Sequence, residues 1–143
     1  MNSYYPTIRV RLDSAATIPV RKHDTDAGAD IYARETLRVP PHGSVIVDTG
    51  VHVELPENTK GEIMTRSSLN INNDIITTGL IDEGFTGEIK VKLYNLGDKW
   101  QVFKAGERIA QLVVSPVCYP DYVEAERISG GERGDGGYGS TGR

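Results

Sequence analysis

Four stretches of alternating apolar and polar residues restrict the fold of this chain more than any other feature. They are TIRVRL at 7–12, SVIVDTGVHVEL at 44–55, EIKVKLYN at 88–95 and RIAQLVVSPV at 108–117. A period of two predicts strands with one buried face, because successive side chains of a strand point to opposite sides. No window repeats apolar residues at helical spacing over a long stretch. Residues 68–73 alone predict one short helix, with Ser67 or Ser68 as its N-cap.

Turn residues separate these stretches at regular intervals. Proline, glycine and asparagine gather at 40–43, 56–58, 95–98 and 104–106. Many short strands with such turns are typical of a sandwich or barrel, so we predict an all-β jelly roll. A chain of 143 residues is sufficient for one domain with a real core. The composition changes at Gly130, so we expect a core over residues 1–129 and a glycine-rich arm over 130–143.

Composition excludes several classes of protein. The net charge of −4 argues against a protein that coats nucleic acid, which carries a basic excess. The sequence has no apolar run long enough to span a membrane and no apolar signal-peptide core, so we expect no membrane partner and a cytoplasmic location. Cys118 is the only cysteine, which excludes an internal disulfide and a cysteine-rich zinc site. A small anionic ligand stays compatible with this charge, because a few local donors or a metal can bind it.

The C-terminal residues ERGDGGYGSTGR have too little apolar surface to pack as a strand. Glycine amides can form an anion-binding nest, Arg133 can hold an oxyanion and Tyr138 can stack on a flat ring. Phosphate together with an aromatic base indicates a nucleotide, while a disordered tail is the alternative. The G-x-G-x-x-G match at 134–139 lacks a following helix, so it does not predict a dinucleotide site.

Several other residues have both a structural and a chemical interpretation. Arg66 with Ser67 and Ser68 follows a predicted strand, which suits phosphate or else a helix cap beside a surface arginine. Residues 79–88 join two strands and predict a hairpin, in which Asp82 is either a turn acid or a general base. Gln111 is polar on an apolar strand, and so is a candidate ligand contact.

Acids and ring side chains elsewhere are also ambiguous. Asp26 and Asp30 suit a cap or turn, or an outer-sphere role toward magnesium. The histidines show no metal spacing, and we place His23, His42 and His52 at the surface. Trp100 and Phe103 are interpreted as core or interface packing.

Taken together and in order, five segments resemble the motifs of the homotrimeric dUTPases. The segments are DAGADIYA from Asp26, GEIMTRSS ending at Ser68, GLIDEGFTGE from Gly79, GERIAQL from Gly106 and RGDGGYGSTG from Arg133. The likeness extends from about the first strand to the last residue, and the fifth segment is the most specific. The resemblance implies a jelly-roll subunit in a homotrimer, with each active site shared between subunits, and an enzyme that hydrolyses dUTP to dUMP and diphosphate.

The resemblance also implies a role for each matching residue. Asp82 would orient the water that attacks the α-phosphorus, with Gln111 near that water or the α-phosphate. Phosphate contacts would come from Arg66, Ser67 and Ser68. Mg²⁺ would sit on the three phosphates, with Asp30 reaching it only through water. Uracil would pair with the backbone between Gly79 and Lys90, including Leu80 and Ile81, and Phe85 would exclude a ribose hydroxyl. The arm would supply the remaining substrate contacts, Arg133, Tyr138, Gly139, Ser140 and Thr141.

Two positions depart from the family pattern, and two rival functions remain. Phe85 stands where tyrosine is usual and Tyr138 where phenylalanine is usual; both keep the ring. A dCTP deaminase of the same fold would also fit residues 81–87, but it needs a glutamate where this chain has Lys92. A non-catalytic, nucleotide-binding regulatory trimer is the other rival, and it would not need a base at Asp82.

Overall fold

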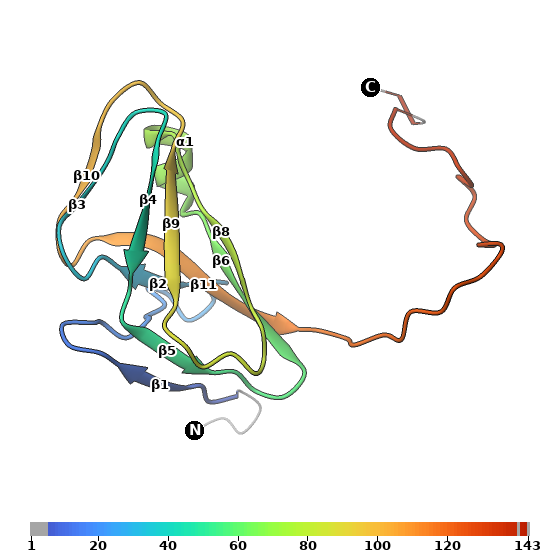
Figure 1. Ribbon diagram of the computed structural model, residues 1–143, viewed down its shortest axis with the longest axis horizontal. Coiled ribbons are helices and arrows are strands. Elements are labelled where there is room, and N and C mark those ends of the chain that lie inside the picture. Colours follow the sequence, from blue (N-terminus) through green and yellow to red (C-terminus); the bar gives the residue numbers. More distant parts are fainter. Residues whose placement is uncertain (1–5, 140, 143) are drawn as a thin grey trace.

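The computed structural model describes residues 6–139, 141 and 142, and these residues form a β-rich body with one short helix (Figure 1). The all-β prediction is therefore confirmed. The elements in chain order are β1 Arg9–Leu12, β2 Ala29–Tyr32, β3 Leu37–Val39, β4 Ser44–Asp48, β5 Val51–Glu54, β6 Thr59–Met64, α1 Ser67–Asn73, β7 Ile75–Ile76, β8 Thr78–Ile81, β9 Lys90–Asn95, β10 Gln101–Phe103 and β11 Arg108–Pro116.

The strands form four antiparallel sheets. One sheet has the order β2-β11-β6-β8, a second has β4-β9-β7, and two-stranded ladders join β1 to β5 and β10 to β3. Most neighbours are distant in sequence, so the fold is held mainly by long-range pairing. The order β2-β11-β6 matters for function, because it places three segments from different parts of the chain side by side.

One hydrophobic core joins these ladders. Strand β9 alternates without a break, with Val91, Leu93 and Asn95 buried and the residues between them exposed. Asn95 is tolerated in the core because its amide donates to the carbonyl oxygens of Val39 and Lys99 at 3.2 and 2.7 Å. Phe103 is buried as predicted, whereas Trp100 is exposed.

Three local predictions need correction. The predicted continuous strand at 44–55 is broken into β4 and β5, and Gly50 adopts a left-handed φ of 71° at the break. The helix begins at Ser67, one residue before the predicted start. Its N-cap is Arg66, with no side-chain cap hydrogen bond, so neither serine caps it.

The predicted hairpin at 79–88 is also wrong. Strand β8 pairs with β6, whereas β9 pairs with β4 and β7, so the connection crosses from one sheet to another. Alternation in the two flanking strands could not reveal this, because it defines their faces and not their partners. We call residues 82–89 the β8–β9 loop.

Candidate active site

Three neighbouring strands assemble the largest group of predicted site residues. In the ladders, Gln111 of β11 lies opposite Asp30 of β2 on one side and Met64 of β6 on the other. Arg66 follows β6 by two residues and so reaches the same place. The structure therefore brings the first, second and fourth motif segments together within a single chain.

The Asp30 carboxylate lies between two guanidinium groups in this cleft. Its oxygens are 3.5 Å from Nε of Arg66 and 3.6 Å from Nη1 of Arg108, and its side chain is 14% exposed. Two cations around one carboxylate leave a net positive charge, which favours binding of an anion. Asp30 therefore holds the two arginines in position as well as facing the cleft.

Gln111 links two of these segments through its side chain. Its Nε2 donates a hydrogen bond to the carbonyl oxygen of Thr65 at 3.0 Å. Gly28 lies directly beneath it, and a Cβ added there would collide with the Gln111 amide and Cβ. Glycine is therefore required at 28 by the close approach of a polar side chain.

The cleft is large enough for a charged small molecule. Its cavity is about 460 Å³ and is lined by charged, hydroxyl and small side chains: Lys22, His23, Asp26, Ala27, Gly28, Asp30, Arg66, Ser67, Ser68, Arg108 and Gln111. An adjoining cavity of about 690 Å³ shares Lys22, Asp30, Arg66 and Arg108. In the cavity of about 460 Å³, three cations face two carboxylates, so this cavity is locally basic although the whole chain is acidic.

Sequence reasoning missed Arg108 and Lys22 as lining residues. Arg108 and Gln111 are three apart, so a regular strand would send them to opposite faces. The register of β11 against β2 shifts between Arg108 and Ala110. Such a bulge re-aims side chains, and here it lets both residues line one cleft.

Asp82 does not line this cleft; it directly follows the last residue of β8. It lines a separate cavity of about 280 Å³ together with Leu80, Glu83 and Tyr119. The Oε1 atom of Glu83 accepts hydrogen bonds from the amide of Asn58 at 2.6 Å and the Tyr119 hydroxyl at 2.8 Å. The bond to Glu83 raises the pKa of the Tyr119 phenol. These contacts tie the start of the β8–β9 loop to the body.

The rest of this segment is ordered by packing against glycine and by ion pairs. Gly79 lies opposite Ile63 and Ile81 opposite Gly61 in the ladder of β8 with β6. The Phe85 ring lies over Gly87, where an added Cβ would be 2.7 Å from it. Lys90 pairs with Asp48, and this hydrogen bond raises the pKa of its ammonium group.

The segment after β11 leads away from the strands and continues into the arm at residues 130–143 (Figure 1). Its local bonds are internal: Nη2 of Arg133 donates to the carbonyl oxygen of Gly137 at 2.8 Å, and the Gly136 amide donates to the carbonyl of Arg133. The Tyr138 ring is fully exposed. Gly139 and Thr141 lie in the same segment, while Ser140 falls outside the described residues. The chain thus carries its predicted site residues in three separate groups.

Comparison with protein families gives one match over most of the chain. The family model described as dUTPase matches residues 14–142. The deoxyuridine 5'-triphosphate nucleotidohydrolase of Crocosphaera subtropica is 43% identical over 136 residues, covering 93% of this chain and 96% of that protein. The protein of the same name from Corynebacterium diphtheriae is also 43% identical over 136 residues, covering 92% of this chain and 90% of its own length.

Solved structures show the same likeness in three dimensions. The dUTPase of Staphylococcus bacteriophage 80alpha with dUpNHpp has a TM-score of 0.87 and 31% identity, covering 97% of this chain and all of that one. A dUTPase variant from phage phi11 of S. aureus, which coordinates a structural Mg(II) ion, has a TM-score of 0.79 and 27% identity, covering 85% of this chain and 98% of that one. These likenesses also confirm the jelly-roll class.

Proposed function

This chain belongs to the dUTPase family, and from that premise we propose that it hydrolyses dUTP to dUMP and diphosphate. The observation that carries the proposal is the basic cleft in which Arg66 and Arg108 flank Asp30. The cleft concentrates positive charge in an acidic protein, as a triphosphate requires. The complete set of five motif segments supplies the remaining contacts.

The proposed reaction is an in-line displacement at the α-phosphorus. Asp82 accepts a proton from the attacking water, whose oxygen bonds to the α-phosphorus while the bond to the α–β bridging oxygen breaks. Diphosphate leaves with that oxygen. Such a transfer depends mainly on positioning and charge neutralisation. Arg66, Ser67 and Ser68 line the cleft that would hold the phosphates, and Gln111 lies beside them.

The cleft fits a magnesium ion only as part of a substrate complex. Among the described residues, no group of three or more histidine, cysteine or carboxylate side chains could hold a metal. Asp30 already faces two guanidinium groups, so it suits an outer-sphere contact through water. Phosphate oxygens would be the main ligands, as is usual for Mg²⁺. The bound ion would neutralise the charge of the triphosphate.

The three separate groups of site residues support a homotrimer with shared sites. We propose that the cleft of one subunit meets the β8–β9 loop of a second and the arm of a third. Light scattering should then give about three times the 15.7 kDa mass of the chain. Full activity in a monomer would contradict this assembly.

Within the described residues, no helix has the length and apolarity needed to cross a bilayer.

The substrate assay separates this proposal from a deaminase of the same fold. Lys92 lies on the exposed face of β9 with its Nζ 5.2 Å from the centre of the Tyr94 ring, where a deaminase would need a carboxylate. We expect dUTP to yield dUMP and diphosphate in the presence of Mg²⁺, with dCTP unchanged and UTP slow. Ammonia released from dCTP would overturn the proposal.

The role of Asp82 is tested by Asp82→Asn. A positioned base contributes about 10²-fold or more to the rate, so kcat should fall by at least that factor. The dUTP analogue dUpNHpp should still bind. Asp121→Asn, at an exposed position in the segment after β11, is the matched control and should leave kcat unchanged. Near-normal turnover by a folded Asp82→Asn protein would reduce Asp82 to a turn residue. Nucleotide binding without any hydrolysis by the unmodified protein would favour the regulatory alternative.

A further inference from the structure

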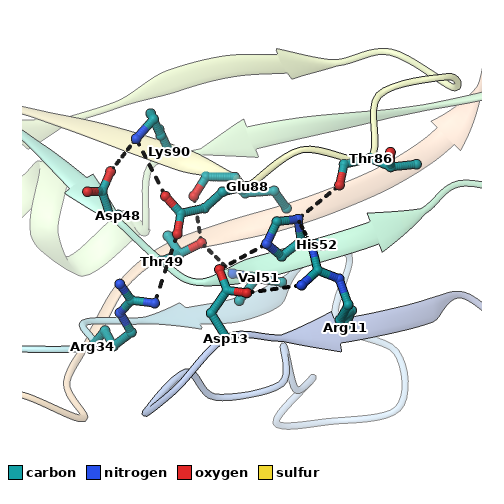
Figure 2. Close-up of polar contacts among 11 residues, drawn as sticks. Arg11, Asp13, Arg34, Asp48, Thr49, Val51, His52, Thr86, Glu88 and Lys90 are labelled. Carbon is teal, nitrogen blue, oxygen red and sulfur yellow. Dashed lines mark hydrogen bonds and ion pairs between the residues drawn. The ribbon is translucent and has the colours of Figure 1, made fainter.

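His52 is a largely buried histidine beside the middle of the β8–β9 loop. It extends from β5, and its side chain is 12% exposed, so the prediction that it lies at the surface is wrong. Figure 2 shows its ring between Asp13, which follows β1, and Thr86 of the loop. His52 therefore joins a segment near the N-terminus to a loop of the proposed substrate site.

The two ring nitrogens of His52 have different partners. Nε2 is 2.9 Å from Oδ2 of Asp13, and Nδ1 is 2.9 Å from the carbonyl oxygen of Thr86. Nδ1 is also 3.1 Å from Nη2 of Arg11 (Figure 2). An ionised carboxylate only accepts hydrogen bonds, so Nε2 carries a hydrogen in either charge state of the ring.

The neighbours of Nδ1 make opposite demands on that atom. A guanidinium only donates, so Arg11 requires a bare nitrogen. A carbonyl only accepts, so Thr86 requires an N–H group. The imidazolium therefore bonds to Thr86, whereas the neutral ring bonds to Arg11 and leaves the carbonyl unpaired. Arg11 keeps a partner in both states, because its Nη1 lies 3.2 Å from Oδ1 of Asp13.

The hydrogen bonds around the ring favour the imidazolium. The hydrogen bond with Asp13 and then the bond with the Thr86 carbonyl raise the pKa of His52 above its usual 6.5, against opposition from burial and Arg11. The same pairing with His52 lowers the pKa of Asp13. Other charged groups around this site are Arg9 and Glu54, which line the same pocket, and Arg34, which acts on Asp13 and pairs with Glu88 at 3.9 Å.

The Thr86 carbonyl belongs to the peptide unit that supports the Phe85 ring. That unit joins Thr86 to Gly87, and the ring of Phe85 lies directly over Gly87. The two ends of the loop have their own anchors. The Phe85 amide donates to the carbonyl of Asp82 at 3.0 Å, and the Thr49 hydroxyl donates to the carbonyl of Ile89 at 2.6 Å. His52 is thus the side chain that holds the middle of the loop.

We propose that His52 is a positioning residue for Phe85: as the imidazolium it fixes the Thr86–Gly87 peptide beneath the ring, and on losing its proton it releases that peptide. This inference rests on the proposed function, in which the Phe85 ring excludes the ribose 2′-hydroxyl. Discrimination of dUTP from UTP should then depend on the charge of His52. The Phe85 ring should be held tightly at pH values below the pKa of His52 and loosely at pH values above it.

The test measures the ratio of kcat/KM for dUTP to that for UTP from about pH 5.5 to about pH 9, the range over which histidine titrates. The ratio cancels pH effects common to both substrates. We expect it to fall by about 3- to 10-fold as pH rises, less than the effect of removing a steric contact altogether. His52→Gln should give a low ratio that does not change with pH.

Two further variants keep His52 and should move the pH midpoint of the kcat/KM ratio in opposite directions. Asp13→Asn removes the favourable carboxylate and should shift the midpoint of the ratio to lower pH. Arg11→Met removes the competing donor together with its charge and should shift this midpoint to higher pH. Shifts of about 0.5 to 1 pH unit are expected for single charges at these distances. Shifts in the same direction, or none, would overturn the proposal.

The matched control is His42→Gln, which changes another histidine paired with an aspartate, at 2.7 Å from Asp98 and beyond the end of the β4–β9 ladder that is opposite the loop. It should leave the pH dependence of the ratio intact. NMR titration of His52, with His52→Gln assigning its signals, supplies a readout that does not need turnover. The Gly87 amide and Phe85 ring signals should follow the same midpoint.

These readouts distinguish the two proposals. If dUTP is not hydrolysed but the Gly87 and Phe85 signals still titrate with His52, the proposed function is refuted. The link between His52 and the loop is then upheld. Hydrolysis with a ratio independent of pH, while His52 titrates, would refute the positioning role alone. A His52 that does not titrate in this range would refute it as well.

Discussion

The phosphate-facing cleft and the C-terminal arm carry similar chemical groups, but the fold holds them very differently. In the cleft, Asp30 is 14% exposed and each neighbouring arginine has a carboxylate to pair with. In the arm, Tyr138 is fully exposed, and the Arg133 side chain donates to the backbone carbonyl of Gly137, four residues away. The cleft is assembled before any ligand arrives, whereas the bonds seen among the described residues of the arm join residues of the arm to one another.

This difference separates two ways of contributing to binding. Residues of the cleft were ordered when the strands paired, so they bind without a further entropy cost. Ordering the arm costs about 1–2 kcal/mol per residue in backbone entropy, so ligand contacts must offset it. Changes in the arm should therefore alter activity without altering stability, and changes in the cleft should alter both.

Deleting residues 133–143 should produce the largest separation of these effects. Loss of base stacking and of a charge-assisted phosphate contact together is expected to lower kcat/KM by roughly 10² to 10⁴-fold. Calorimetry should show a nearly unchanged melting temperature, because the described arm residues are exposed. A truncated protein that hydrolyses dUTP at the full rate would mean that the arm has no role.

Gly28→Ala tests the cleft from the opposite direction. The new Cβ would collide with the Gln111 side chain, including its Cβ, which cannot swing away. Overpacking of this kind costs roughly 1–3 kcal/mol in unfolding free energy, and the displaced amide should lower kcat/KM as well. Gly84→Ala is the stability control, since nothing lies within 4 Å of its added Cβ. Unchanged stability in Gly28→Ala would contradict the preassembled cleft.

The Tyr138 ring is the aromatic group of the arm that could stack on a base. If Tyr138 stacks on uracil, Tyr138→Ala should weaken binding of dUpNHpp by about 1–3 kcal/mol. Tyr138→Phe retains the ring and should bind almost normally. Calorimetric titration measures both, and thermal melting of the free proteins should not distinguish them. Equal losses in the two variants would assign the effect to the hydroxyl instead of stacking.

The smallest expected effect concerns the pH dependence of stability around His52. Its raised pKa means that its stabilising contribution is complete below 6.5 and is lost as pH rises through the folded-state value. The lowered pKa of Asp13 means that its contribution is complete above 3.8 and is lost as pH falls through the folded-state value. In urea unfolding, the free energy of unfolding of His52→Gln should therefore fall furthest below that of the unmodified protein between pH 3.8 and pH 6.5. A deficit that grows toward alkaline pH would reverse the assigned sign.

The sequence predicted strands well where burial alternates along them, as it does in β9. The run at 88–95 alternates in the structure as it does in the sequence, and β11 lies within its predicted stretch. The break at Gly50 and the separate sheets of β8 and β9 were not predictable in the same way. A local pattern states which face is buried, but the partner strand is selected by packing over the whole chain.

The site shows the same division between local and long-range information. The five motif segments, the glycine-rich character of the arm and the chemical groups available to bind a nucleotide are all visible in the order of the residues. Only the tertiary structure placed Arg108 beside Asp30, through a bulge in β11, and His52 between Asp13 and Thr86. Those contacts join residues far apart along the chain, where no short-range spacing rule applies. They arise because antiparallel pairing and burial fix the strands in one register, and the side chains then meet wherever that register brings them.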